Sequence, residues 1–364
     1  MLLSDIILQS CEAALQMQRD DGSFLPGCNG PYNDPENPVR NTAHWLITLL
    51  KAYEISNEPK FRDSAYRAAQ YILLPKLRPM NATFFCRRNP EKDFCNGLMG
   101  QAWIIEALVI AGIILEDNRS LELARNVFAL HPFDYKAGLW RRVNVDGSYN
   151  SFDMTFNHQL WFAAIGSLLD NSSSDTVKSI ISRFLDRVSE SHLKIDRSGR
   201  IRHMISEPSA LLKKISDAIY MLRRMHRLHE ANNKMAIKEI GYHAFNMYAF
   251  SLLKNYMPGH HLWRSAKFLT ALEFINKDEF INGLDNNIFA YPYNPAGFEV
   301  ALTIQEFSPV LSFSKSAEWW VEQQLQRCYS FEDRMMSKLT EDKETLSARL
   351  YEATRLKEMK LQLT

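Results

Sequence analysis

Residues 139–169 read LWRRVNVDGSYNSFDMTFNHQLWFAAIGSLL and combine a polar loop with an apolar helix. The first half contains an aromatic residue, two arginines, a glycine turn and scattered acids and amides. The second half, from residue 157 onward, is apolar almost without a break, which predicts a buried helix. Polar groups gathered directly before a buried helix indicate a loop that lines a pocket, so this stretch is the best candidate for an active site.

The same arrangement occurs twice earlier in the chain. Apolar helices are predicted at residues 41–55, 96–115 and 157–169, and each follows a loop rich in Gly, Asn and Arg. Amphipathic helices follow the apolar ones, and weaker copies of the unit occur at residues 240–256 and 295–307. Recurrence at this spacing is typical of a repeat architecture.

Alternation of these two helix types predicts an all-α fold. A helix that is apolar on every side must be buried, whereas an amphipathic helix can face water. We therefore expect an α/α toroid, in which an inner ring of helices is wrapped by an outer ring and long loops gather at one mouth. A solenoid is the alternative, but its repeats would be shorter and would lack such long loops.

The expected toroid is a single domain over residues 1–330. Residues 191–234 break the period and are interpreted as an extra or displaced helical pair. The last segment, residues 331–364, is charged and helical in pattern. We expect it to be a C-terminal extension that packs on the outside of the toroid.

Composition excludes several classes of protein. The 364 residues are 46% hydrophobic and 23% charged, which is typical of a globular chain. The net charge of +1 gives no indication of a nucleic acid or membrane partner, and we expect neither. Five widely spaced cysteines argue against a disulfide framework. Together with the absence of a basic, signal-like N-terminus and of an uncharged apolar run of about 18 residues, they favour a cytoplasmic protein.

Three segments carry a resemblance to a known group: DGSFLPGCNGPYNDPENPVRNTAHWLITLLKAYEI, CNGLMGQAWIIEAL and DMTFNHQLWFAA. They resemble the inner-helix signatures of six-hairpin toroid proteins that act on carbohydrates. The chain is most similar to the unsaturated glucuronyl and rhamnogalacturonyl hydrolases, which have a loop Asp just before an inner helix. This resemblance covers residues 20–170 and implies an (α/α)6 toroid.

The resemblance also implies an activity. It suggests a glycoside hydrolase that acts on an anionic, uronic-acid-type sugar or oligosaccharide by acid-base catalysis. Polysaccharide lyases and sugar epimerases share the fold, so an epimerase or a lyase remains an alternative. A non-catalytic glycan-binding protein is the third possibility.

Three residues are candidates for catalysis. Asp153 lies four residues before Asn157, and the resemblance implies that it is the general acid; a helix cap is the alternative. His158 begins the same helix and His44 holds the matching place in an earlier one. Two histidines facing one cavity resemble the two-base arrangement of sugar 2-epimerases, although each alone is more often structural.

Five arginines precede the predicted inner helices. Guanidinium groups bind carboxylates through paired hydrogen bonds, so several at one mouth predict an anionic sugar. For each arginine taken alone, a salt bridge to a nearby loop acid is the alternative. The five are Arg40, Arg87, Arg88, Arg141 and Arg142.

Aromatic and amide side chains complete the expected substrate site. Trp140 and Tyr149 are candidates for stacking on a sugar face, with core packing as the alternative. Asn96, Gln101 and Asn157 are candidates for hydrogen bonds to hydroxyl groups, with helix capping as the alternative for Asn96.

No cofactor or metal is expected. The chain contains neither the G-x-x-x-x-G-K-[ST] phosphate loop nor the G-x-G-x-x-G dinucleotide motif. Cys86 and Cys95 bracket a short loop, but their spacing is not that of a zinc ribbon or finger.

Overall fold

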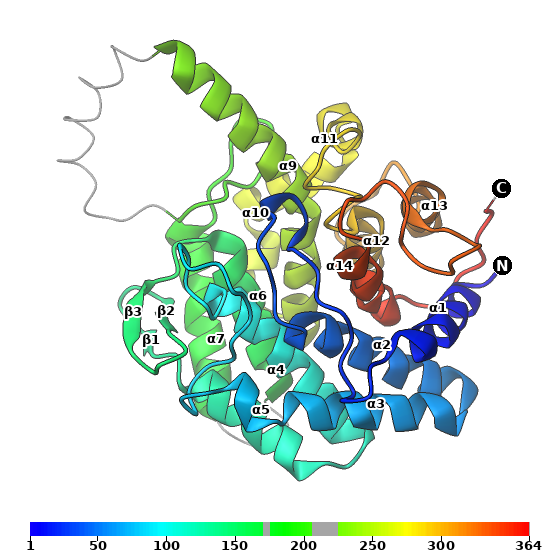
Figure 1. Ribbon diagram of the computed structural model, residues 1–364. Helices are drawn as coiled ribbons and strands as arrows, with labels where there is room; N and C mark the ends of the chain where they lie inside the picture. Colours follow the sequence, from blue (N-terminus) through cyan, green and yellow to red (C-terminus); the bar gives the residue numbers. More distant parts are fainter. Residues whose placement is uncertain (170–174, 206–224, 364) are drawn as a thin grey trace.

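The computed structural model describes residues 1–169, 175–205 and 225–363, and in it inner and outer helices alternate along the chain (Figure 1). The long inner helices are α2 (Val39–Ser56), α4 (Gly97–Ile114), α6 (Phe156–Gly166), α9 (Met225–Tyr256) and α12 (Ala296–Phe307). The outer helices are α1 (Leu3–Met17), α3 (Pro59–Ile72), α5 (Asn118–Ala129), α7 (Asp175–Arg187), α10 (Ala266–Glu273), α11 (Asp278–Gly283) and α13 (Ala317–Cys328).

The distribution of apolar residues explains which helices are inside. Inner helix α4 is buried on all faces, and its exposed side chains are confined to isoleucines near its C-terminal end. Outer helix α5 buries one stripe, which contains Ser120, Ala124 and Val127. Burial of each large apolar side chain stabilises the fold by about 1.5–3 kcal/mol. The helices that are apolar on every side therefore take the inner positions of the ring.

The inner helices form a closed ring. In turn α2 packs against α4, α4 against α6, α6 against α9 and α9 against α12. The ring closes through a last inner element, which consists of α14 (Lys343–Ala348) and the 3-10 helix η7 (Arg349–Arg355) and contacts both α12 and α2. The predicted (α/α)6 toroid is therefore confirmed.

The C-terminal segment differs from the expectation. Residues 331–364 were expected outside the toroid, but Arg349, Leu350 and Glu352 are each at most 1% exposed. The charges of Arg349 and Glu352 do not face water, because these two residues pair with each other. Arg349 also pairs with Glu299 of α12 at 3.1 Å. The segment therefore supplies the sixth inner element of the ring and is not an external extension.

The two ends of the chain lie together beside α1 (Figure 1). The backbone N–H of Leu361 donates to the carbonyl of Met1 at 2.8 Å, and Leu2 bridges to Lys360 in antiparallel fashion. The start of the first outer helix is thus fastened to the chain that leaves the last inner element.

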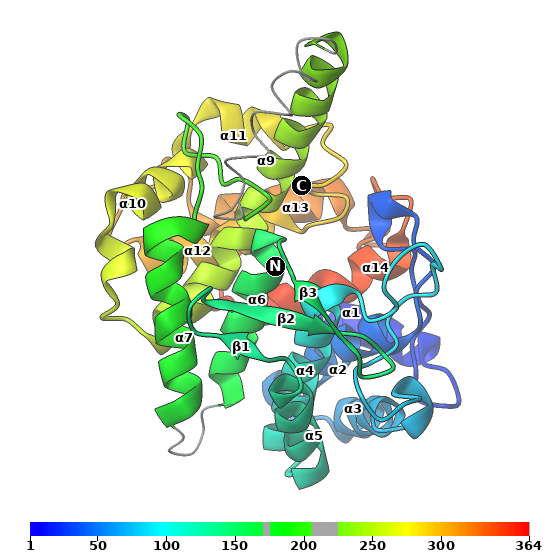
Figure 2. The ribbon, with the colours of Figure 1, turned by 90° about the vertical axis from the view of Figure 1, so that its left-hand side faces the viewer.

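The connections between helices hold a small sheet and short turns. Strands β1 (Phe133–Asp134), β2 (Leu139–Val143) and β3 (Tyr149–Phe152) form an antiparallel sheet in the order β1-β2-β3, in front of the helices in Figure 2. The turns are η1 (Gly30–Tyr32), η2 (Pro75–Leu77), η3 (Ser167–Leu169), η4 (Val188–His192), η5 (His261–Arg264) and η6 (Phe274–Asn276).

Two further expectations concern particular segments. Residues 206–224 of the helical pair expected at residues 191–234 lie outside the described residues, and α9 begins at Met225 within the same range. Within the described ranges, α4 is the one helix long and apolar enough to cross a membrane, and most of it is buried inside the ring.

We predict that Leu350→Ala lowers the free energy of unfolding by about 2–5 kcal/mol, because it removes buried methyl groups from the inner ring. The matched control is Leu339→Ala in the same C-terminal segment, where the side chain is 63% exposed. That control should change stability by less than about 0.5 kcal/mol. Urea denaturation of both variants measures the difference, and equally small losses would contradict the inner position of this segment.

Candidate active site

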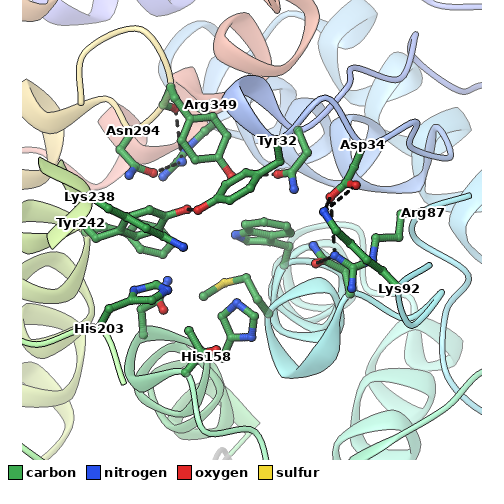
Figure 3. Close-up of a pocket in the computed structure, with 18 residues that line it drawn as sticks. Tyr32, Asp34, Arg87, Lys92, His158, His203, Lys238, Tyr242, Asn294 and Arg349 are labelled. Atoms are coloured by element: carbon green, nitrogen blue, oxygen red, sulfur yellow. Dashed lines mark hydrogen bonds and ion pairs between the residues drawn. The ribbon is translucent and has the colours of Figure 1, made fainter. Parts of the chain in front are cut away.

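A pocket opens near the N-terminal ends of the inner helices α4, α6 and α12 (Figure 3). Its cavity has a volume of about 180 Å³ and is partly open to solvent. Residues from the loop before α2, from the loop before α4 and from α9 and η7 complete its wall. The free N–H groups at helix starts make such a mouth favourable for polar and anionic ligands.

His158, in the first turn of α6, faces this pocket (Figure 3). Asp153, behind it, holds its imidazole in place. The imidazole Nδ1 and a carboxylate oxygen of Asp153 are 2.8 Å apart. Because the carboxylate accepts, Nδ1 carries a proton, and in the neutral ring Nε2 therefore presents a lone pair. The pair thus has the arrangement of a general base and the residue that orients it.

Asp153 itself is buried behind His158. Burial alone would raise the pKa of its carboxyl, but the neighbouring His158 lowers it, as do hydrogen bonds from the backbone N–H groups of Leu98 and Thr155, and the resulting pKa is about 2. A carboxyl group with this pKa is ionised near neutral pH. Asp153 is therefore not placed to act as the general acid that the resemblance implied.

The backbone at the start of α4 makes room for this pair. Asn96 and Gly97 both adopt left-handed conformations, with φ of 55° and 56°. A Cβ atom on Gly97 would lie 2.5 Å from the Asp153 carboxylate oxygen and 3.1 Å from Nδ1 of His158. Gly97 is thus required both by its own backbone and by the close approach of the pair.

His203 also lines the pocket. Its backbone N–H donates to Glu239 at 3.2 Å and its carbonyl accepts from the backbone of Phe156 at 2.9 Å, which holds this segment against the start of α6. Burial lowers the pKa of the imidazole to about 3, and the nearby charges of Lys238 and His158 contribute. His203 is therefore neutral over the physiological range.

Cations surround the upper part of the pocket. Lys92 pairs with Asp34 at 2.8 Å, and Arg87 pairs with Asp93 at 3.3 Å. The carboxylate of Asp34 also accepts from Asn89, and these contacts lower its pKa although burial alone would raise it. Asp34 is the one carboxylate among the described residues that line the pocket, and it is already engaged.

Uncharged polar groups line the remaining surface. The side-chain oxygen of Asn157 and the indole N–H of Trp103 are buried and lack hydrogen-bond partners. Buried polar groups are rarely left unpaired in native proteins, so these atoms are suited to the hydroxyl groups of a ligand. Tyr293 lines the opposite wall and donates to Asn29 at 2.8 Å.

Four of the predicted site residues line the pocket: Arg87, Asn96, Asn157 and His158. Asp153 lies directly behind them through its bond to His158. The pocket thus adjoins the second half of residues 139–169 but not the first.

His44 lies in the core. Its ring stacks on Tyr351 with centroids 4.2 Å apart and meets Trp103 edge-on. Burial, with the charges of Arg40 and Arg349, holds its pKa well below the usual value. Because His44 does not line the pocket, its position argues against a catalytic role.

Two other predicted residues are structural. Arg40 is buried, donates to Asn29 and pairs with Glu36 at 3.1 Å. Its guanidinium lies 3.9 Å from the ring centroid of Trp103. Gln101 is engaged with backbone groups, since it accepts from Phe84 and donates to the carbonyl of Cys95.

The small sheet explains why residues 139–149 do not reach the pocket. Successive strand residues point to opposite faces, so Trp140 enters an aromatic core beside Phe133, with ring centroids 4.6 Å apart. Tyr149 is 71% exposed. An interpretation of residues 139–149 as a loop does not predict that successive side chains point to opposite faces.

The remaining arginines stay outside the pocket lining. Arg141 lies 4.4 Å above the ring of Phe152, and Arg142 donates to Ser151 at 2.9 Å. Arg88 donates to Asn37 at 2.7 Å. The clustering of five arginines at one mouth is therefore not found.

Sequence reasoning missed most of the residues that line the pocket. The overlooked residues that carry charge or acid-base groups are Asp34, Lys92, His203, Lys238, Tyr242 and Arg349. Asp34 and Lys92 lie in the polar loops before α2 and α4, so the sequence pattern could have indicated them as site residues. The others come from segments whose place in the ring was not predicted.

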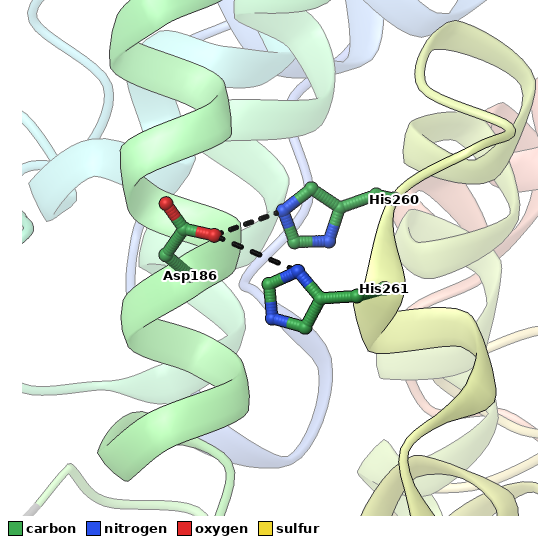
Figure 4. A group of neighbouring side chains, drawn as sticks. All are labelled: Asp186, His260 and His261. Carbon is green, nitrogen blue, oxygen red and sulfur yellow. Dashed lines mark ion pairs between the residues drawn. The ribbon is translucent and has the colours of Figure 1, made fainter.

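One group of possible metal ligands exists among the described residues, formed by Asp186, His260 and His261 (Figure 4). Nε2 of His260 lies 3.3 Å from the Asp186 carboxylate, while its Nδ1 accepts from the backbone N–H of Leu262. Nδ1 therefore has no proton, and Nε2 of the neutral ring carries one. A nitrogen that carries a proton cannot bind a metal, so this geometry favours an electrostatic contact of the neutral imidazole N–H with the carboxylate, between α7 and the start of η5.

No protein-family model matches the chain. The chain is 42% identical over 371 residues to archaeal glycosylation protein Q of Haloferax volcanii, and the match covers 99% of each protein.

Solved structures share the fold at low sequence identity. Cellobiose 2-epimerase from Bacillus thermoamylovorans B4167 has a TM-score of 0.62 and 10% identity, over 93% of both chains. A D-mannose isomerase has a TM-score of 0.62 and 12% identity, over 96% of both chains. An unsaturated glucuronyl hydrolase specific for heparin has a TM-score of 0.59 and 11% identity, over 97% of this chain and 95% of that one. These structures establish the six-hairpin toroid.

We predict that Gly97→Ala destabilises the protein by at least about 1–2 kcal/mol, because alanine is strained at this positive φ. It should also displace the Asp153–His158 pair and weaken any activity of the pocket. Gly259→Ala is the control, since a Cβ atom there meets nothing within 4 Å. Urea denaturation and activity assays on both variants test this, and a Gly97→Ala protein as stable as the control would refute the argument.

Proposed function

This chain belongs to the family of archaeal glycosylation protein Q, and we propose that it is a sugar aldose–ketose isomerase that works by proton transfer. The observation that carries the proposal is the Asp153–His158 pair, which faces a polar pocket together with the neutral imidazole of His203. A base beside a neutral hydrogen-bond donor suits removal of a proton next to a carbonyl group.

The geometry favours this chemistry over glycoside hydrolysis, the first expectation from the sequence. Most glycosidases use two carboxyl groups on either side of the scissile bond. Here Asp34 is the one carboxylate among the described pocket residues, and Lys92 and Arg87 already pair with it. Asp153 is ionised and covered by His158. A protonated carboxyl group that could donate to a leaving group is thus lacking among the described pocket residues.

The proposed reaction begins with the open-chain aldose. Nε2 of His158 removes the proton from C2, the C1–C2 double bond forms, and negative charge develops on O1. The proton on O2 moves to O1, and the protonated His158 returns its proton to C1, which yields the ketose. Asp153 stabilises the imidazolium that exists between the two transfers.

The low pKa of His203 favours isomerisation over epimerisation. An epimerase that works on both faces of C2 needs a second group that carries a proton, but His203 resists protonation because it is buried beside Lys238. A neutral imidazole can instead donate a hydrogen bond to O1 and stabilise its developing charge. Epimerisation at C2 is therefore the second candidate, favoured only by the presence of two histidines.

The names of the solved structures that share the fold include sugar isomerisation and epimerisation, but they do not distinguish isomerisation from hydrolysis for this chain. The cellobiose 2-epimerase and the D-mannose isomerase that share the fold are named for reactions on sugar carbons, whereas the glucuronyl hydrolase is named for hydrolysis. The name of the relative, archaeal glycosylation protein Q, supports a role for this chain in glycosylation. We further propose a cytoplasmic location, which the free state of all five cysteines supports.

Solvent isotope exchange provides the central test. We expect that incubation with candidate aldoses in D2O converts a substrate to its ketose with deuterium bound to carbon, observed by proton NMR. Substrate deuterated at C2 should pass part of its label to C1 in H2O, because one base removes and returns the proton. Release of reducing ends from oligosaccharides without exchange would overturn the proposal, and a C2 epimer formed without any ketose would favour the second candidate.

We predict that His158→Ala lowers turnover by about 10²- to 10⁴-fold, the usual contribution of a general base. His261→Ala is the control, because this side chain is 63% exposed and lies outside the pocket. Comparable turnover in the two variants would exclude His158 as the base.

Asp153→Asn tests the orienting role separately. An amide at this position can donate to Nδ1 and so place the proton on Nε2, where the base is needed. We expect turnover to fall about 10²- to 10⁴-fold while substrate binding is retained. Circular dichroism and calorimetric binding check the fold and the affinity, and full activity would show that His158 needs no oriented tautomer.

A further inference from the structure

We propose that Glu239 of α9 is a positioning residue for the proton transfer, because its carboxylate sets the place of His203 relative to His158. Glu239 is not among the residues that line the pocket, so it acts through His203 and not on the substrate. This inference rests on the proposed function, since it assumes that His203 donates a hydrogen bond to the reacting oxygen of the sugar.

The carboxylate of Glu239 is buried, and both of its oxygens accept hydrogen bonds. Oε1 accepts from the backbone N–H of His203 at 3.2 Å. Oε2 accepts from Nη1 of Arg202 at 2.9 Å and from Nε of Arg200 at 3.2 Å. One side chain thus ties α9 to residues 200–203, which precede it in the sequence.

The segment that carries His203 is also joined to the start of α6. The backbone N–H of Phe156 donates to the carbonyl of His203 at 2.9 Å, and that of Ile205 donates to the carbonyl of Met154 at 2.9 Å. His158 follows Phe156 closely in α6. These bonds hold the backbones of the two histidines together, but the imidazole of His203 must also be placed against α9.

The ring of His203 packs on the same helix that carries Glu239. Its centroid lies 5.3 Å from that of Tyr242, which comes about one helical turn after Glu239. Figure 3 shows His203 and Tyr242 on one side of the pocket, next to Lys238. The hydrogen bond from the backbone of His203 to Glu239 therefore sets where the imidazole lies along this wall.

Neutralisation of the two arginines does not account for Glu239. Arg200 also pairs with Glu279, at 3.2 Å. The side chain of Arg202 is 44% exposed, so water solvates its charge. The contact that these charges leave unexplained is the one between the Glu239 carboxylate and the backbone N–H of His203, which is what a positioning role requires.

A shift of His203 would affect the reaction more than the binding of the sugar. Negative charge on O1 develops only while His158 removes the proton from C2, so a hydrogen bond to O1 strengthens in the transition state. A misplacement of about 1 Å can lower a rate by about a hundredfold. Loss of the Glu239 contact should therefore lower kcat and leave KM nearly unchanged.

Glu239→Gln tests this role in the full chain. A side-chain amide has one acceptor oxygen, so glutamine cannot accept from His203 and from the arginines at the same time. Glu279→Gln is the matched control, because Glu279 is another carboxylate partner of Arg200, is 45% exposed and lies outside the pocket. Glu239→Asp is a second variant, which keeps the buried charge but shortens the side chain by one methylene group.

Steady-state kinetics and NMR of the imidazole provide two independent readouts. We expect kcat of Glu239→Gln to fall about ten- to a hundredfold at nearly constant KM, and Glu279→Gln to match the wild type. Burial keeps the imidazole of His203 neutral in the wild type, with a pKa of about 3. A displaced ring is better hydrated, so its NMR signals should titrate at higher pH in Glu239→Gln.

The outcomes separate this inference from the proposed function. A Glu239→Gln protein with the kcat and the His203 titration of the control would overturn the positioning role, and so would a rise in KM at unchanged kcat. If Glu239→Gln does not fold, Glu239→Asp decides by the same two measurements. Absence of isotope exchange in the wild type would refute the isomerase chemistry, and the NMR titration would then still decide whether Glu239 places His203.

Discussion

The ring depends on one buried arginine, Arg349. Its guanidinium reaches Glu299 of α12, Glu352 of its own helical turn, and the side chain of Asn294 before α12. Burial and the neighbouring Glu352 raise the pKa of Glu299 well above its usual value, which favours one neutral carboxyl group and one ion pair. Removing one member of such a group leaves an uncompensated charge in the interior, so these contacts specify how the last inner element docks.

Arg349 also lines the pocket, so the pocket is complete only when the last inner element has closed the ring. On the opposite side, the Asp153 carboxylate joins the start of α4 to His158 of α6. Both arrangements use helix starts whose backbone N–H groups face the mouth. The chemistry of the pocket is therefore built from the contacts that hold neighbouring inner helices together.

Much of the fold could be predicted from composition alone, because a helix such as α4 has no polar face and must be inside. The C-terminal segment could not, since its charged residues are typical of a surface helix. Arg349 and Arg355 are instead neutralised internally, by Glu299 and Glu352 and by Glu106. Pairing across the ring is a property of the tertiary structure, and no local pattern reveals it.

The candidate site was predictable in position but less so in chemistry. The spacing of Asp153 and His158 before and within α6 indicated two polar groups near one mouth, but spacing does not show that Asp153 is covered by His158. His203 and Lys238 are brought together by the contacts of Glu239, which join segments on either side of residues 206–224. Trp140 was expected to stack on a sugar because residues 139–149 were interpreted as a loop. In strand β2 its side chain points into the aromatic core instead.

The position of the sixth inner element has a consequence for biosynthesis. A chain emerging from the ribosome makes its N-terminal parts first, and α2, α4 and α6 can pack while the rest is still being made. The element that closes the ring is made after all the other inner helices, since η7 spans Arg349–Arg355. Until then the apolar sides of α2 and α12 that it covers face water. A nascent chain therefore stays an open arc without a complete pocket until η7 has been made.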